Sequence, residues 1–235
     1  MTTEINLPDT SFIFKMAPKF CEIVALANLS SKLMTRAIFL TLFLVWAMTG
    51  QAQIIDLRVE KYIAQNCIDT LIVYSYPCSG CIRSDSCHYE EPHYLIWQHN
   101  GGVFLKRFDY CKTYRALPLD SSNPLAFYLK NKRIIDKEQI RPPTYYELRK
   151  NKQKTDTLTV TSTVDHSSYH DFEFVLKEKK SHKYADIYDL DFKTFDNGRK
   201  NIYYTYNQKT RFKALIDLTT ALLKEFDDTN KFEGE

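Results

Sequence analysis

The dipeptide Asn100-Gly101 lies between two apolar runs, and it constrains the fold of this chain more than any other feature. The run before it is 93–97 and the run after it is 103–108. Asn-Gly suits the two central positions of a type I′ turn, which both need positive φ, so the stretch predicts a β-hairpin. A two-residue loop also fixes the register. The expected cross-strand pairs are His99 with Gly102, Trp97 with Phe104 and Leu95 with Lys106.

A further strand is predicted ahead of the hairpin, and a set of cysteines follows it. The strand is 70–76, which is rich in β-branched and aromatic residues and is stopped by Pro77. Extending the hairpin register outward places Cys111 opposite about Glu90. We therefore expect four cysteines to gather at one end of the sheet: Cys78, Cys81, Cys87 and Cys111.

Residues 34–52 have the pattern of a secretory signal peptide. A short basic segment, 34–36, precedes the apolar residues 37–48, and Gly50 and Ala52 are small residues at the expected cleavage positions. Twelve apolar residues rise only about 18 Å as a helix, against a hydrocarbon core of roughly 30 Å, which favours a cleaved signal over a membrane span. We expect translation to start at Met34, residues 1–33 to be an upstream over-extension or an atypical n-region, and the protein to be secreted or periplasmic.

The expected mature chain, 53–235, is long enough for a single globular domain. The whole chain has 32 basic and 29 acidic residues, and residues 1–52 hold four and three of these, so the mature chain keeps a net charge of +2. This balance gives no electrostatic case for binding nucleic acid or, after signal cleavage, an anionic membrane. The partner is unknown, and a protein and a glycan are the candidate ligands. No cofactor or metal is predicted.

The remaining pattern predicts an α+β fold with a mostly antiparallel sheet and a C-terminal amphipathic helix packed on it. Apolar residues at three- and four-residue spacing predict that helix at 210–226. Shorter helices are expected at 54–67 and 125–135, strands at 157–164, 172–176 and 183–190, and a turn at 117–119. Residues 202–206 suit either an edge strand or a lead-in to the last helix. The polar stretch 145–154 is predicted to be a connection, with an internal hinge at 141–155.

Three interpretations of the cysteines remain open. In an exported protein, structural disulfides are favoured, and we expect Cys78 with Cys81 and Cys87 with Cys111. Cys67 is then a free or intermolecular thiol, buried at the end of the first helix. A strand followed by Cys-x-x-Cys resembles the thioredoxin-like oxidoreductases over these four residues, which implies a thiol–disulfide oxidoreductase using Cys78 and Cys81. A structural zinc module using the four clustered thiolates is the third interpretation.

No other pattern predicts catalysis, so a non-enzymatic structural or binding protein is the favoured function. His166 and His170 are four residues apart but fall in a predicted turn, which favours solvated loop residues over metal ligands. The tyrosines Tyr203, Tyr204 and Tyr206 form a candidate aromatic binding face, because tyrosine combines apolar area with a polar tip.

Overall fold

A computed structural model describes residues 57–79, 91–109, 112–151, 154–177 and 179–232. The chain divides into two units, residues 1–67 and 68–235. The described part of the first unit contains helix α4, Leu57–Gln65, with Val59 buried. This helix confirms the one predicted at 54–67. The signal peptide and the upstream segment lie outside the described residues.

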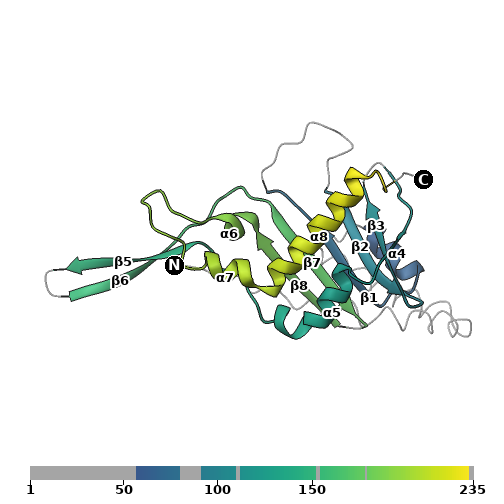
Figure 1. The fold of residues 1–235 in the computed structure, drawn as a ribbon, viewed down its shortest axis with the longest axis horizontal. Helices are drawn as coiled ribbons and strands as arrows, with labels where there is room; N and C mark the ends of the chain where they lie inside the picture. Colours follow the sequence, from purple (N-terminus) through teal and green to yellow (C-terminus); the bar gives the residue numbers. More distant parts are fainter. Residues whose placement is uncertain (1–56, 80–90, 110–111, 152–153, 178, 233–235) are drawn as a thin grey trace, which may run out of the picture. The chain divides into compact units, whose positions relative to one another are not determined.

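A six-stranded antiparallel sheet forms the second unit, with the strand order β4-β3-β2-β1-β7-β8 (Figure 1). Strand β1 lies between β2 and β7, and every pairing in the sheet is antiparallel. The predicted α+β class with an antiparallel sheet is therefore confirmed. The strands are β1 Thr70–Ser75, β2 His93–His99, β3 Gly102–Phe108, β4 Leu117–Leu119, β7 Tyr169–Leu176 and β8 Lys179–Asp186.

Strands β2 and β3 form a hairpin around Asn100-Gly101. Both turn residues have positive φ, 49° for Asn100 and 80° for Gly101, as a type I′ turn requires. The register pairs His99 with Gly102, Trp97 with Phe104 and Leu95 with Lys106, which are the pairs that the two-residue loop predicts. The pairing ends at His93 and Phe108, so the extrapolated position of Cys111 opposite Glu90 lies outside the described residues.

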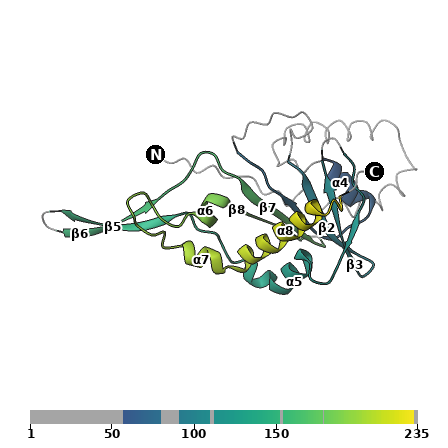
Figure 2. The ribbon, with the colours of Figure 1, turned by 45° about the horizontal axis from the view of Figure 1, so that its top comes forward.

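Helices α5 and α8 cover one face of this sheet (Figures 1 and 2). Helix α5, Pro124–Ile135, begins at Asn123, whose side chain accepts a hydrogen bond from the Ala126 N–H. Helix α8, Arg211–Asp228, begins at Thr210, whose side chain accepts one from the Lys213 N–H. These caps satisfy N–H groups that have no partner inside the helix. The C-terminal helix predicted at 210–226 is confirmed.

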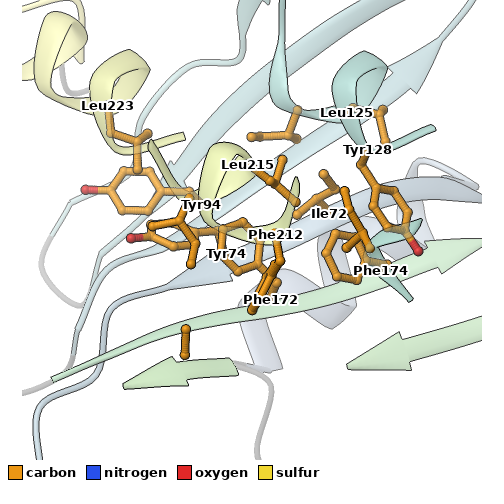
Figure 3. Close-up of a cluster of buried hydrophobic side chains, with 14 of the residues drawn as sticks. Ile72, Tyr74, Tyr94, Leu125, Tyr128, Phe172, Phe174, Phe212, Leu215 and Leu223 are labelled. Atoms are coloured by element: carbon orange, nitrogen blue, oxygen red, sulfur yellow. The ribbon is translucent and has the colours of Figure 1, made fainter. Parts of the chain in front are cut away.

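The core lies between these helices and the sheet (Figure 3). Tyr128 of α5 stacks on Phe174 of β7 with their ring centroids 3.8 Å apart, and Phe172 meets Phe212 of α8 edge-on at 5.7 Å. Burial of such rings dominates core energetics, at roughly 25 cal/mol for each Å² of apolar surface removed from water. The fully buried large side chains include Tyr74, Tyr128, Phe172, Phe174, Phe212, Ile72, Ile96 and Leu105.

Strands β5, Thr144–Asn151, and β6, Lys154–Thr161, form a separate two-stranded sheet, here called the ribbon. Both views show it extending away from the six-stranded sheet (Figures 1 and 2). The prediction of a connection at 145–154 was therefore wrong. The ribbon is largely exposed, so β5 shows none of the apolar alternation that marks a strand with one buried face.

Three smaller predictions are also corrected. Residues 117–119 form the edge strand β4 rather than a turn, and an edge position tolerates Pro118 because its missing N–H is not needed there. The strand predicted at 183–190 ends at Asp186, which caps helix α6, Ile187–Asp191. Residues 202–206 lead into helix α7, Tyr204–Lys209, instead of forming an edge strand.

Gly101→Ala should lower the free energy of unfolding by about 1 to 2 kcal/mol, because alanine is strained at positive φ. No atom lies within 4 Å of the position that its Cβ would occupy, so steric contact adds nothing to this cost. Urea unfolding measures the change. Asn100→Gly is the control, and it should change the stability by less than half as much; an equal loss in both variants would contradict the type I′ turn.

Candidate functional site

Two of the predicted cysteine positions, Cys67 and Cys78, are described. Cys67 is a free thiol, and it is exposed rather than buried as the sequence suggests. Cys78 is disulfide-bonded, and its backbone forms a β-bridge with Ser168 that continues the β1–β7 pairing. The pairing of Cys78 stays a prediction, because Cys81, Cys87 and Cys111 lie outside the described residues.

The backbone of Cys78 is described, whereas residues 80–90, which complete the Cys-x-x-Cys motif, lie outside the described residues. An activated thiol sits at a helix N-terminus, where the helix dipole lowers its pKa. Cys78 instead lies in extended backbone, and β1 has an antiparallel neighbour on each side. Within the described part of the chain, no group of three or more His, Cys, Asp or Glu residues could hold a metal ion.

His170 is buried in β7, which corrects the prediction of a solvated loop residue. Its Nδ1 lies 2.9 Å from the Tyr74 hydroxyl of the neighbouring strand. Burial, the largest effect, together with the charge of Lys213 lowers the pKa of His170 to about 4, and Asp217 opposes this shift. Burial also raises the pKa of Tyr74 well above its usual value. The pair therefore stays neutral near pH 7. His166, by contrast, is exposed.

The neutral state of His170 predicts a loss of stability in acid. The unfolded chain binds a proton at this residue near pH 6.5, whereas the folded chain does so only near pH 4. Protonation therefore favours the unfolded state between these values, and the free energy of unfolding should fall by on the order of 2 kcal/mol as the pH drops through this window.

Urea unfolding at about pH 7 and about pH 4.5 measures this loss. His170→Gln keeps a hydrogen-bond partner for Tyr74 but has no imidazole to protonate, so its stability should depend less on pH. The same pH dependence in the variant and the wild type would count against the assignment.

Two buried asparagines fix the loop before β5 to the segment before α8. The Asn207 side chain accepts a hydrogen bond from the Arg141 N–H at 3.0 Å and donates to the Arg141 carbonyl at 2.8 Å and the Asp189 carbonyl at 3.0 Å. Asn201 accepts from the N–H groups of Thr144 and Tyr203 and donates to the Phe192 carbonyl. Both asparagines are at most 5% exposed.

An arginine and two tyrosines meet at this fixed loop. The Arg141 guanidinium lies 4.8 Å from the Tyr203 ring centroid and 5.3 Å from that of Tyr206. Such contacts stabilise by about 0.5 to 1 kcal/mol at exposed sites. Two similar contacts lie nearby in the sequence, Lys193 over Tyr204 and Arg199 over Tyr145. The structure therefore brings the three tyrosines of the predicted aromatic face together with cationic side chains.

A cavity of about 480 Å³ adjoins the same loop, since Pro142 lines it. Its walls come from the loop after α5, from β8, from α6 and from the start of α8, and they include Glu138, His182, Lys183, Asp189 and Phe212. Burial raises the pKa of Asp189 to about 6, with Asp186 adding to this effect. Burial lowers the pKa of Lys183.

Most of these cavity groups already have structural partners. The Glu138 carboxylate accepts hydrogen bonds from the N–H groups of Arg211 and Phe212 at the start of α8. Lys183 donates to the Glu138 carbonyl, and His182 pairs with Asp171. The walls thus hold charged and aromatic groups in fixed positions. We call Arg141, Tyr203, Tyr206 and the adjoining cavity the loop site.

Sequence reasoning found the tyrosines but not the other residues of the loop site. Arg141, Asn207 and Asp189 lie far apart in the chain and follow no motif, and the burial of an asparagine cannot be read from its neighbours. The Arg-Pro-Pro break at 141–143 is the one local signal that marks the loop.

No protein-family model matches this chain, and no match was found among curated proteins or solved structures. In the part of the chain that the structure describes, no helix combines the length and apolar character needed to cross a membrane.

Asn207→Ala should lower the free energy of unfolding by about 2 to 3 kcal/mol, because it removes three hydrogen bonds of a fully buried side chain, to the Arg141 N–H and to the carbonyls of Arg141 and Asp189. Urea unfolding gives the value. Asn197→Ala is the matched control: this residue is exposed in a turn, and the change should cost under about 1 kcal/mol. Equal losses in the two variants would show that Asn207 does not hold the loop.

Proposed function

We propose that this chain is an exported, non-enzymatic binding protein whose binding surface is the loop site. One observation carries the proposal. The Arg141 side chain lies against Tyr203 and Tyr206. The backbone N–H and C=O groups of Arg141 are both hydrogen-bonded to the side chain of Asn207, which is fully buried. Arginine and tyrosine are the residue types that contribute most at binding surfaces. A loop held in one conformation loses little freedom when a ligand binds, which favours affinity.

The chemistry of the loop site indicates the kind of ligand. Tyr206 is 41% exposed, so part of its ring can stack on a ligand. The guanidinium of Arg141 offers planar donors that match a carboxylate or sulfate group. An acidic glycan or a peptide with acidic side chains supplies both a flat apolar surface and such an anionic group.

The cysteine segment has a structural role in this proposal. The disulfide bond of Cys78 supports a covalent cross-link just after β1. The proposed pairs are Cys78 with Cys81 and Cys87 with Cys111. The oxidoreductase and zinc alternatives gain no support from the described residues, in which Cys78 lies in extended backbone and no group of three or more His, Cys, Asp or Glu residues could hold a metal ion.

Glycan and peptide arrays test the proposal with the exported protein. Tyr206→Ala and Arg141→Gln should each lower the array signal by at least about tenfold, because each removes one side of the Arg–Tyr surface. Tyr76→Ala is the matched control, since Tyr76 is 37% exposed but lies at the end of β1. No array signal for the wild type, or equal losses in all three variants, would overturn the proposal.

A further inference from the structure

The outer edge of β5 is partly occupied and partly open. The Thr144 N–H donates to the Asn201 side chain, and the Thr144 carbonyl accepts from the Ile202 N–H. Both groups of Thr144 therefore point away from β6. Backbone groups alternate in direction along a strand, so those of Tyr146, Leu148 and Lys150 point the same way. Arg199 donates to the Tyr146 carbonyl, which agrees with this alternation.

Beyond Tyr146 this edge has no partner within the described residues. No strand pairs with β5 apart from β6. Leu148 is 68% exposed and Tyr146 is 54% exposed, and both lie on one face of the ribbon. A two-stranded sheet is at best marginally stable in water, and an open apolar edge is a template for another strand.

The sequence around Leu148 is complementary to itself. Glu147 and Arg149 flank Leu148, and both lie on the face opposite to its side chain. If two copies of β5 pair antiparallel about a two-fold axis at Leu148, each Glu147 comes opposite Arg149 of the other copy. The two Leu148 side chains then meet on the other face, and Tyr146 comes opposite Lys150. Arg149 also faces Asp156 of its own ribbon, so the charges alternate across the contact.

The other strand edges are less well matched to a second copy. Strand β8 contains Lys179, Lys180 and Lys183 in eight residues, and such charges discourage edge pairing. Strand β4 has three residues with Pro118 in the middle. On the outer edge of β6, an axis at Thr157 would set Asp156 opposite Leu158, with no charge pairing. An axis at Thr155 would set Lys154 opposite Asp156, but it lies at the end of the strand and leaves only residues 154–156 of β6 to pair. Among the described edges, β5 therefore offers the longer pairing with matched charges.

We infer that the chain forms a homodimer in which two β5 strands pair antiparallel about Leu148, giving a four-stranded sheet in the order β6-β5-β5-β6. The pairing extends over residues 146–150 of each copy, because the segment around Asn201 occupies the edge at Thr144. It requires the side chain of Arg199, which donates to the Tyr146 carbonyl and pairs with Glu147, to swing away from this edge. An overlap of five residues is smaller than a standard interface, so the dissociation constant is on the order of micromolar. This dimer does not depend on the loop site having a ligand.

A charge-swap cycle tests the register by sedimentation equilibrium of the exported protein. The wild type should dimerise as its concentration is raised from about 1 to about 300 µM. Glu147→Arg and Arg149→Glu each create two pairs of like charges in the dimer, one on each side of the two-fold axis. Each variant should therefore weaken the dimer by at least about tenfold. The double variant Glu147→Arg/Arg149→Glu restores opposite charges and should recover most of the affinity. Lys179→Glu, an equal change of charge on β8, should have no effect.

A pair of proline variants tests the edge itself. Leu148→Pro removes an N–H that points outward, so it should abolish the dimer while leaving the β5–β6 bonds intact. Thr157→Pro is the matched control, because Thr157 lies directly opposite Leu148 and its N–H points to the other edge. Far-UV circular dichroism checks that each variant is folded. A wild type that stays monomeric, single charge swaps without effect, a double variant as weak as the single ones, or a control proline that also abolishes the dimer would each overturn the inference.

Discussion

The position of β1 between β2 and β7 is the constraint on which the rest of this structure depends. Four consecutive residues of β1, Leu71 to Tyr74, are at most 6% exposed, so both faces of this strand are buried. Its antiparallel neighbours come from segments about 20 and 100 residues further along the chain. The hairpin of β2 and β3 is local, whereas the pairing of β1 with β7 encloses α5 and the ribbon within one long excursion. That excursion carries Arg141 of the loop site, whereas Tyr203 and Tyr206 follow β8.

The local parts of the fold could be predicted from the sequence, because they follow from neighbouring residues. Asn100-Gly101 sets the hairpin register, Asn123 with Pro124 starts α5, and the spacing of Phe212, Leu215 and Ile216 identifies α8. Turn geometry, capping and helical periodicity all act within a few residues. The α+β class follows from the order of these elements.

The errors lie where distant residues decide the structure. The sequence of β5 resembles a polar connection, because β5 pairs only with the equally exposed β6 and does not pack on the core. Strand 157–164 was expected to return to 172–176, but β7 pairs with β1 and β8 instead. His170 was predicted to be a loop residue, because its contact with Tyr74, which lies 96 residues earlier in the chain, cannot be seen in the local sequence. In the loop site the tyrosines were predicted from composition, whereas Arg141, Asn207 and Asp189 become neighbours only through the fold.

Asn201 and Asn207 also determine how mechanical load passes through this unit. The ribbon joins the rest of the unit near Thr144, whose N–H and C=O groups are bonded to the segment at 201–202. Part of a force that pulls on the ribbon is therefore transmitted to α7 and the start of α8 through these hydrogen bonds, and part passes along the backbone from β6 into β7. The backbone of Thr144 is held by two hydrogen bonds, whereas β1 and β7 pair over six residues, so under tension the base of the ribbon should open before the six-stranded sheet does.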